Sequence, residues 1–262
     1  MEIKRDYTEH YVAFIDILGF KDLLDNKESC DAIFSVFQCL MDNSQTKMFY
    51  NGEDVSAFDH VKHYIMSDSI VLYIRADIEE AFFALVGTCL YLQKSLLYRQ
   101  KPVLVRGGIA KGPLFVEEQI IFGKGLSDAY IIESTSAIFP RIVFNKRLYE
   151  DAKKNNQSPK RTYWEALTIR EDSDELCFVH YLALNYVRAL DKIPALFENV
   201  FEFCQQHLDS TYNKSVREKY LWLKKYIQNE TDLQKQLIKN YPGGKELIGK
   251  WVINDRMKRN NK

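Results

Sequence analysis

Hydrophobic positions along the chain follow two patterns: short continuous runs, typical of buried strands, and longer stretches with helical spacing. The run YVAFIDI at 11–17 predicts a central strand, and HVKHYIM and SIVLYIR predict a hairpin that bends at Ser67 and Asp68. Four later segments predict further strands, with a glycine-containing turn at the end of the first: VLVRGGIAKGPLFV, QIIFG, RIVF and LCFVHYLAL. Helices are predicted over 21–42, 79–99, with Asp77 as its N-cap, 125–135, 146–154 and most of the chain beyond residue 190.

This order of elements, β-α-ββ-α-β followed by further strands and helices, predicts an α+β fold with a mixed sheet and helices on one face. A ferredoxin-like core is the natural candidate. We predict two domains: a core over residues 1–187 and a helical C-terminal extension over 188–262. The extension is expected to pack on the core or to enlarge a dimer interface.

The composition argues against several classes of protein. Of the 262 residues 46% are hydrophobic and 13% aromatic, so the chain can bury a sizeable core. The 36 Lys and Arg residues balance the 36 Asp and Glu residues, which gives no electrostatic argument for a nucleic-acid partner. We expect no membrane insertion, because no apolar run reaches about 18 residues, and MEIKRDYTEH is not a signal peptide. The scattered cysteines predict reduced thiols in a cytoplasmic protein, without a zinc site or a catalytic thiol: 30, 39, 89, 177 and 204.

Two aspartates interrupt apolar, strand-like runs: Asp16 in FIDILGF and Asp68 in MSDSIVLYI. A buried carboxylate is costly unless something pairs with it. In a ferredoxin-like core the first strand and the middle hairpin are neighbours, so we expect the two carboxylates to lie side by side. Oxygen ligands of this kind suit Mg²⁺ or Mn²⁺, and free N–H groups in the turn after Asp16 would favour a phosphate. The alternative is that Asp16 caps a helix and that Asp68 only forms a turn.

Four segments taken together resemble the class III nucleotidyl cyclases over residues 10–185: FIDILGF, MSDSIV, VRGGIAKGPLF and FGKGLSDAYIIE. The resemblance implies that Asp16, the carbonyl of Ile17 and Asp68 hold two Mn²⁺ or Mg²⁺ ions per active site, although Ser67 replaces the family's glycine. The family also has a strand with the motif arginine-x-glycine-isoleucine followed by a further glycine, which matches Arg106, Gly108, Ile109 and Gly112. The backbone around Leu18, Gly19 and Phe20 would hold the β- and γ-phosphates.

The position four residues before the second aspartate reads the base in this family, and here it is Tyr64. A phenol is bulkier than a carboxylate and can donate to a carbonyl or accept from an amine, which suits a pyrimidine. With a tyrosine at this position and the run AY-II-E…PRI, the chain resembles the pyrimidine cyclases of the Pycsar anti-phage systems. Those enzymes make cyclic UMP or cyclic CMP, which activates a separate effector protein. The alternative is that Tyr64 is an ordinary strand aromatic.

The chain departs from the family where a helical asparagine and arginine normally stand, because Ser127 and Ile131 occupy those positions. Ser127 and Lys124 stay candidates for substrate binding. Isoleucine has no donor, so another cation would have to contact the α-phosphate. Arg141 is the first candidate for this catalytic role, followed by Lys124, Arg106 and Lys111. For Arg106 a structural ion pair at a strand end is the alternative.

The resemblance implies a pyrimidine nucleotide cyclase that converts UTP, or CTP, to cyclic UMP or cyclic CMP and pyrophosphate. Class III domains work as dimers, so a homodimer with shared active sites is expected, in which Tyr64 faces Asp16 and Asp68 of the other copy. Three other functions stay open: a catalytically weak or inactive nucleotide sensor, a purine-specific cyclase and a polymerase-like palm. The zero net charge and the lack of a basic tract disfavour the last.

Overall fold

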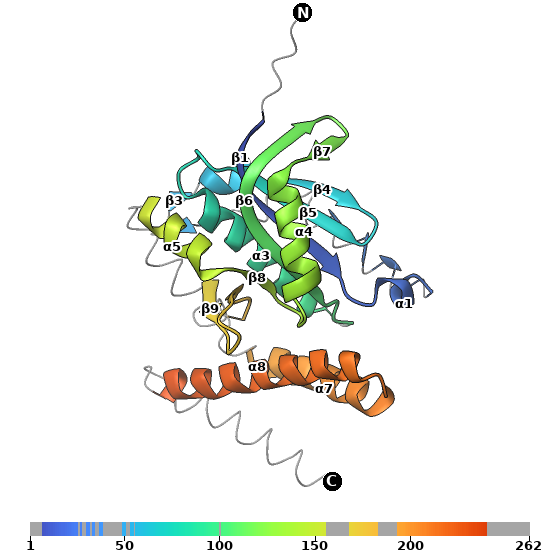
Figure 1. Cartoon of the computed structure of the whole chain (residues 1–262). Helices are drawn as coiled ribbons and strands as arrows, with labels where there is room; N and C mark the ends of the chain where they lie inside the picture. The colour runs from blue at the N-terminus through green and yellow to red at the C-terminus, as the bar shows by residue number, and fades with distance from the viewer. Residues whose placement is uncertain are drawn as a thin grey trace, which may run out of the picture. The chain divides into compact units, whose positions relative to one another are not determined.

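An eight-stranded mixed sheet organises the first part of the chain, in the order β4-β5-β1-β6-β8-β10-β9 with β7 paired to β6 (Figure 1). Neighbouring strands are antiparallel except β6 and β8, which are parallel. The strands of this sheet are β1 (Thr8–Ile17), β4 (Lys62–Met66), β5 (Ser69–Arg75), β6 (Val105–Glu117), β7 (Ile120–Phe122), β8 (Ile142–Phe144), β9 (Ile169–Glu171) and β10 (Cys177–Val179). Strands β2 (Phe49–Tyr50) and β3 (Glu53–Asp54) form a separate pair.

The helices of the first part are α1 (Phe20–Leu24), the 3₁₀ helix η2 (Ser56–His60), α3 (Ala81–Leu97), α4 (Lys124–Ser136) and α5 (Lys146–Asn155). Those of the second part are α7 (Ile193–Ser210) and α8 (Lys214–Lys239).

This computed structural model describes residues 7–25, 49–50, 53–54, 56–99, 101–155, 168–182 and 193–239, with isolated positions between 27 and 38. The chain divides into two compact units, Met1–Tyr181 and Leu182–Lys262. The predicted domain boundary at 187/188 lies outside the described residues, as do the end of the predicted helix 21–42 and the last residues of the predicted strand LCFVHYLAL.

The first four long strands have the order β4-β5-β1-β6, and each neighbouring pair is antiparallel. This is the strand order of a ferredoxin-like sheet, in which the first strand lies between the third and the fourth. The predicted α+β class and ferredoxin-like core are therefore confirmed. The hairpin bends at Ser67 and Asp68 as expected, and Ser67 has a positive φ of 56°.

Helices cover both faces of the sheet. The ring of Tyr11 on β1 lies 5.4 Å from that of Phe82 on α3, whereas the ring of Phe14 lies 5.3 Å from that of Tyr130 on α4. Because odd and even positions of a strand point to opposite faces, α3 and α4 lie on opposite sides of β1. The expectation of helices on one face is therefore wrong. A strand buried on both sides explains why the run around β1 is apolar without alternation.

Strand β6 continues through its glycines to Glu117, so the predicted turn inside this segment is wrong. The glycines serve close packing instead. A Cβ on Gly108 would lie 2.6 Å from the backbone N of Glu133, and one on Gly112 would lie 2.9 Å from the backbone N of Gly125. Because these positions lack side chains, the backbone of α4 approaches the backbone of β6 directly.

The predicted N-cap of the helix α3 is also wrong. The helix begins at Ala81, and Glu80 before it makes no side-chain cap. The carboxylate of Asp77 accepts hydrogen bonds from Arg75 instead, at 3.1 Å from Nε and 2.8 Å from Nη2.

The second unit contains the helical pair α7 and α8, which confirms that this part of the chain is helical. The ring of Tyr220 on α8 stacks on His207 of α7 at 4.6 Å, and Phe203 lies 5.8 Å away. No helix in the described ranges combines the length and apolar character that a membrane span requires.

Candidate active site

Asp16 and Asp68 come together at one end of the sheet. Asp16 is the second-last residue of β1 and stands opposite Ser69, the first residue of β5, so Asp68 lies in the adjoining turn. The backbone N–H of Ile17 donates to the carbonyl of Asp68 at 3.0 Å, which ties the two segments together. The expected proximity follows from antiparallel pairing, because the end of one strand meets the start of its neighbour.

Arg106 joins Asp16 from the other side. The two residues are directly opposite in the pairing of β1 with β6, and Arg106 Nε donates to Asp16 Oδ2 at 3.2 Å. The other end of the guanidinium reaches α4, where Nη2 lies 2.8 Å from Oε1 of Glu133. One arginine thus bridges two carboxylates, and Glu133 is the more deeply buried of them, with 4% of its side chain exposed against 22% for Asp16.

Burial raises the pKa of Glu133 above its ordinary value. Arg106 opposes this shift by favouring the charged form, while the charges of Asp16 and Asp68 raise the pKa further. Glu133 therefore senses the charges of both aspartates as well as that of the guanidinium. This concentration of negative charge would attract a cation.

Glu133 was not predicted as a site residue, although its spacing from Gly125 and Ala129 indicates that it is buried. The buried residues of α4 are Gly125, Ala129 and Glu133, at successive intervals of four. Such spacing places them on one helix face. A glutamate that continues a stripe of small, buried residues requires a charged partner inside the fold, because buried carboxylates are otherwise unfavourable.

The donor atoms available for a divalent cation are the carboxylates of Asp16 and Asp68 and the carbonyl of Ile17. Hard oxygen donors of this kind fit Mg²⁺ or Mn²⁺. Within the described ranges no group of three or more His, Cys, Asp and Glu side chains has the arrangement of a metal site. A site here would hold its ion with two carboxylates and backbone oxygen, completed by water or substrate.

The turn after Asp16 offers fewer phosphate contacts than predicted. The backbone N–H of Leu18 donates to the carbonyl of Leu104 at 2.9 Å, and that of Ile17 is bonded to Asp68. The predicted contact of the Leu18 N–H with phosphate is therefore wrong for this conformation. Gly19 has a left-handed φ of 72° and leads directly into α1 at Phe20, where helix N–H groups begin.

Tyr64 lies on the same face of the sheet as Asp16, in the neighbouring cross-strand row. That row runs from Tyr64 through Val71 and Phe14 to Gly108. The ring packs against the apolar cluster beneath α4, and its hydroxyl donates to the carbonyl of Gln119 at 3.0 Å. Since the O–H of Tyr64 already donates to Gln119, the hydroxyl oxygen could only accept a hydrogen bond from a ligand.

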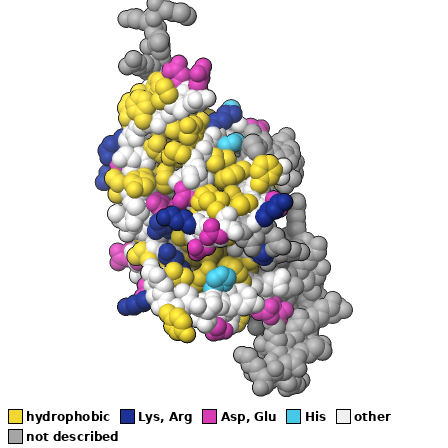
Figure 2. Space-filling view, turned by 90° about the vertical axis from the view of Figure 1, so that its right-hand side faces the viewer, with side chains coloured by type: hydrophobic (Ala, Val, Ile, Leu, Met, Phe, Trp, Pro, Cys, Tyr) yellow, Lys and Arg dark blue, Asp and Glu magenta, His cyan; other side chains and the backbone are white. Residues whose placement is uncertain are grey.

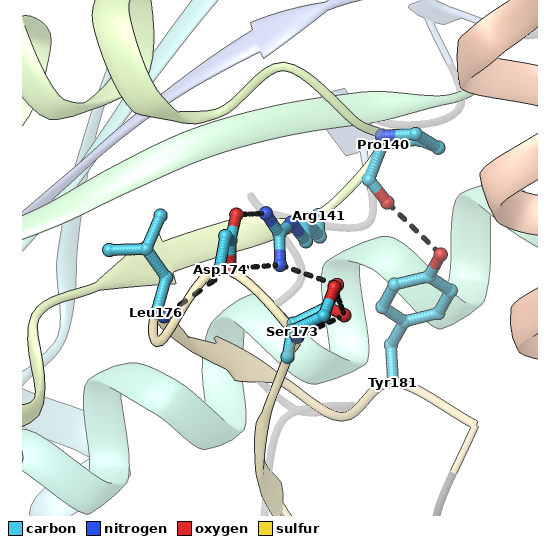
Figure 3. A network of polar contacts seen from close by, with 7 residues as sticks. Pro140, Arg141, Ser173, Asp174, Leu176 and Tyr181 are labelled. Atoms are coloured by element: carbon cyan, nitrogen blue, oxygen red, sulfur yellow. Dashed lines mark hydrogen bonds and ion pairs between the residues drawn. The ribbon is translucent and has the colours of Figure 1, made fainter.

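Arg141 is buried in a different place. None of its side chain is exposed, and Nη1 donates to Asp172 at 2.6 Å. Nη2 pairs with Asp174, as Figure 3 shows. Its guanidinium also faces the rings of Phe139 and Phe178. These contacts anchor the β9–β10 turn to the start of β8, so the geometry favours a structural role over the predicted catalytic one.

The remaining candidates lie away from Asp16 within one chain. Lys124 and Ser127 are exposed in the first turn of α4, about 13 Å and about 9 Å along the helix from Glu133. Lys124 Nζ lies 2.6 Å from Asp128. Lys111 and Ile131 line a cavity of about 590 Å³ with residues of α5, and neither Asp16 nor Asp68 contributes to it. A single chain thus does not bring these residues to the aspartates.

No protein-family model and no curated protein matches this sequence. The chain is similar in fold to solved structures, among them the adenylyl cyclase CyaB from P. aeruginosa, at 14% identity, covering 68% of this chain and 96% of that one with a TM-score of 0.48. A second is the catalytic core of a rhodopsin-guanylyl cyclase with converted specificity in complex with ATPalphaS, at 15% identity, 66% and 95% coverage and a TM-score of 0.46. A third is a bacterial light-regulated adenylyl cyclase, at 13% identity, 74% and 99% coverage and a TM-score of 0.39. At these identities and TM-scores, the similarity by itself assigns no activity to this chain.

Proposed function

We propose that this chain is a nucleotidyl cyclase that converts a pyrimidine nucleoside triphosphate, UTP in preference to CTP, to the cyclic monophosphate and pyrophosphate. The observation that carries the proposal is the meeting of Asp16 and Asp68 at adjoining strand ends, on the face where Arg106 and Glu133 lie. Two carboxylates beside a cationic side chain supply what phosphoryl transfer needs, namely positioned oxygen ligands and compensation of phosphate charge.

In this proposal Asp16, Asp68 and the carbonyl of Ile17 would hold two Mn²⁺ or Mg²⁺ ions. Bound there, the ions would promote ionisation of the ribose 3′-hydroxyl and offset the charge of the phosphates. The 3′-hydroxyl would lose its proton to water, and the 3′-oxygen would form a bond to the α-phosphorus. The bond from that phosphorus to the bridging oxygen would break, and pyrophosphate would leave with the electron pair. Arg106 would contribute positive charge to the phosphates. No side-chain nucleophile is needed.

The pyrimidine preference rests on Tyr64. Its ring would narrow the base pocket, and its hydroxyl, which donates to Gln119, would accept from uracil N3–H or from the N4 amine of cytosine. Both bases satisfy this requirement, so UTP and CTP have to be compared directly.

The proposal includes a homodimer, because Tyr64 would read the base bound to the aspartates of a second copy. Large hydrophobic side chains exposed on β4, β7 and α4 support an associating surface: Met66, Ile120, Phe122, Tyr130 and Ile131. Figure 2 shows hydrophobic side chains gathered over the upper part of one face of the molecule. In the biological setting that the resemblance suggests, the cyclic nucleotide would be a cytoplasmic signal made during phage infection, acting on a separate effector protein.

A second candidate function is a nucleotide sensor that binds its ligand without turnover. Two observations favour it. Arg141 forms ion pairs with Asp172 and Asp174. The side chain of Ile131 on α4 is half exposed, but it has no hydrogen-bond donor to offer a phosphate. Retained nucleotide binding without any cyclic product would identify this function.

The test is incubation of the purified protein with Mn²⁺ and each of ATP, GTP, CTP and UTP, with products identified by mass spectrometry. We expect a cyclic pyrimidine monophosphate that disappears in Asp16→Ala and in Asp68→Ala. Asp59→Ala, which removes an exposed carboxylate of η2, is the matched control and should keep activity. A folded, dimeric protein that yields no cyclic product would exclude the cyclase and leave the sensor.

A further inference from the structure

The guanidinium of Arg106 lies between two carboxylates that belong to different elements. Asp16 comes from β1 and Glu133 from α4, at 3.2 Å and 2.8 Å from the nearest guanidinium nitrogen. A third contact, from Nη1 to the carbonyl of Ala137 at 3.4 Å, holds the group on the side of α4. Only one of these two carboxylates, Asp16, is a candidate ligand for a divalent cation.

Arg106 and a divalent cation would compete for Asp16, because both are positive and both need its carboxylate. A guanidinium that lost Asp16 without a second partner would be left partly buried and unpaired, which is costly. Glu133 removes that cost, since it offers a buried carboxylate on the opposite side of the guanidinium.

The position of Glu133 is fixed by backbone packing. A Cβ added to Gly108 would lie 2.6 Å from the backbone N of Glu133. Because glycine has no Cβ, α4 packs directly against β6 at this point without intervening side chains. Gly108 is two residues from Arg106 on the same strand, and Glu133 belongs to the buried stripe of α4. The backbone of Glu133 is therefore fixed against the strand that carries Arg106, and its carboxylate lies 2.8 Å from the guanidinium, where an outer group that orients a ligand set would stand.

We propose that Glu133 is a positioning residue of the candidate site, which retains Arg106 beside the aspartates when Asp16 transfers from Arg106 to a divalent cation. The inference rests on the proposed function in one respect, namely that Asp16 belongs to a metal site. Arg106 is then an internal counter-ion that stabilises the site before metal arrives, and Glu133 keeps it within reach of the substrate afterwards.

The test is the affinity of the full-length protein for Mn²⁺ without nucleotide, measured from the electron paramagnetic resonance signal of free Mn²⁺. Arg106→Met removes the competitor and should tighten Asp16-dependent binding. Among the described residues, Glu133→Gln leaves Arg106 with Asp16 as its only charged partner, and it should weaken binding on the order of tenfold. In the double variant the Glu133→Gln effect should vanish, because there is no arginine left to retain. Glu79→Gln, at an exposed glutamate, is the matched control and should leave the affinity unchanged.

The double variant should therefore bind Mn²⁺ as tightly as Arg106→Met alone. A merely structural role of Glu133 would weaken Mn²⁺ binding whether or not Arg106 is present. Unchanged or weaker Mn²⁺ binding in Arg106→Met would overturn the inference, and so would a Glu133→Gln effect that persists without Arg106. Arg106→Met tests the competition by itself if Glu133→Gln does not fold.

Cyclic product is measured on the same preparations. If cyclic product forms but Glu133→Gln leaves the Mn²⁺ affinity unchanged, this inference is overturned and the proposed function stands. The expected Mn²⁺ responses without any product would support this inference and count against the cyclase.

Discussion

Arg106 and Asp16 face each other across the pairing of β1 with β6 and form an ion pair of 3.2 Å. The candidate metal aspartate is thus neutralised by a residue of the neighbouring strand, and Glu133 holds the other end of the same guanidinium. The site carries its own cation, in the place where the positive charge of a metal ion would otherwise be required to balance Asp16.

Arg106→Lys should lower cyclase turnover at least about tenfold while changing the free energy of unfolding by less than about 1 kcal/mol. A lysine has no planar fork with which to bridge two carboxylates, but it keeps the positive charge that the buried carboxylate of Glu133 requires. Turnover by mass spectrometry and urea denaturation check this prediction. Arg75→Lys, in an exposed pair with Asp77, is the control and should keep turnover. Full activity in Arg106→Lys would establish Arg106 as a structural ion pair only.

Arg141→Met should reduce the free energy of unfolding by about 3 kcal/mol, because Asp172 and Asp174 would lose a buried partner. Urea denaturation measures the loss. Arg147→Met is the matched control: its side chain is 92% exposed, and we expect a change within about 0.5 kcal/mol. A fully stable Arg141→Met protein that had lost only turnover would instead support the catalytic role predicted from sequence.

Gly108→Ala should destabilise the fold by about 1 to 3 kcal/mol or prevent folding, because the added methyl meets the backbone of α4 and cannot be accommodated by a rotamer change. Thermal unfolding followed by circular dichroism is the measurement. At Gly19 a methyl would meet open space, so Gly19→Ala costs only the strain of a left-handed backbone, about 1 kcal/mol. Equal losses for both variants would contradict the close packing of α4 on β6.

Tyr64→Phe should reduce the preference for pyrimidine over purine triphosphates, since it removes the hydroxyl that would contact the base. The loss of the bond to Gln119 should cost about 1 kcal/mol of stability. The ratio of kcat/KM values for UTP, CTP, ATP and GTP checks the first effect. Tyr73→Phe, on the adjacent strand and the same face, is the control. An unchanged ratio would show that Tyr64 is an ordinary strand aromatic.

Acid should destabilise the protein through His180. Burial lowers the pKa of His180 from its ordinary 6.5 to about 3, and the charge of Arg170 acts in the same direction. Between these values the unfolded chain binds a proton that the folded chain does not, so stability falls as pH falls below about 6.5. From pH 7 to pH 5.5 the loss should be about 1 kcal/mol.

Urea denaturation at pH 7 and pH 5.5 measures this loss of stability in the wild-type protein and in His180→Gln. The His180→Gln variant should not show the loss. His60→Gln, at an exposed histidine, should retain it. The same pH dependence in His180→Gln as in wild type would show that His180 does not titrate in this way.

The strands around the site could be predicted because their signals are local. A run as apolar as YVAFIDI is typical of a strand covered on both sides, and β1 is such a strand. The short interval between HVKHYIM and SIVLYIR leaves room only for a turn, which Ser67 and Asp68 form. The glycines of β6 were misinterpreted because a glycine that permits close approach and a glycine that permits a turn look alike in sequence.

By itself the sequence determined the strands of the sheet except β9, for which no strand was predicted. It also placed Asp16 and Asp68 at the ends of neighbouring strands, since periodicity, turn chemistry and strand order suffice for that. Only the tertiary structure decided the charge partners: Arg106 with Asp16 and Glu133, and Arg141 with Asp172 and Asp174. The pair of Arg106 with Asp16 joins positions 90 residues apart, and that of Arg141 with Asp172 joins positions 31 apart. Ion pairs of this kind depend on strand register, helix packing and burial, which no local pattern of residue types contains.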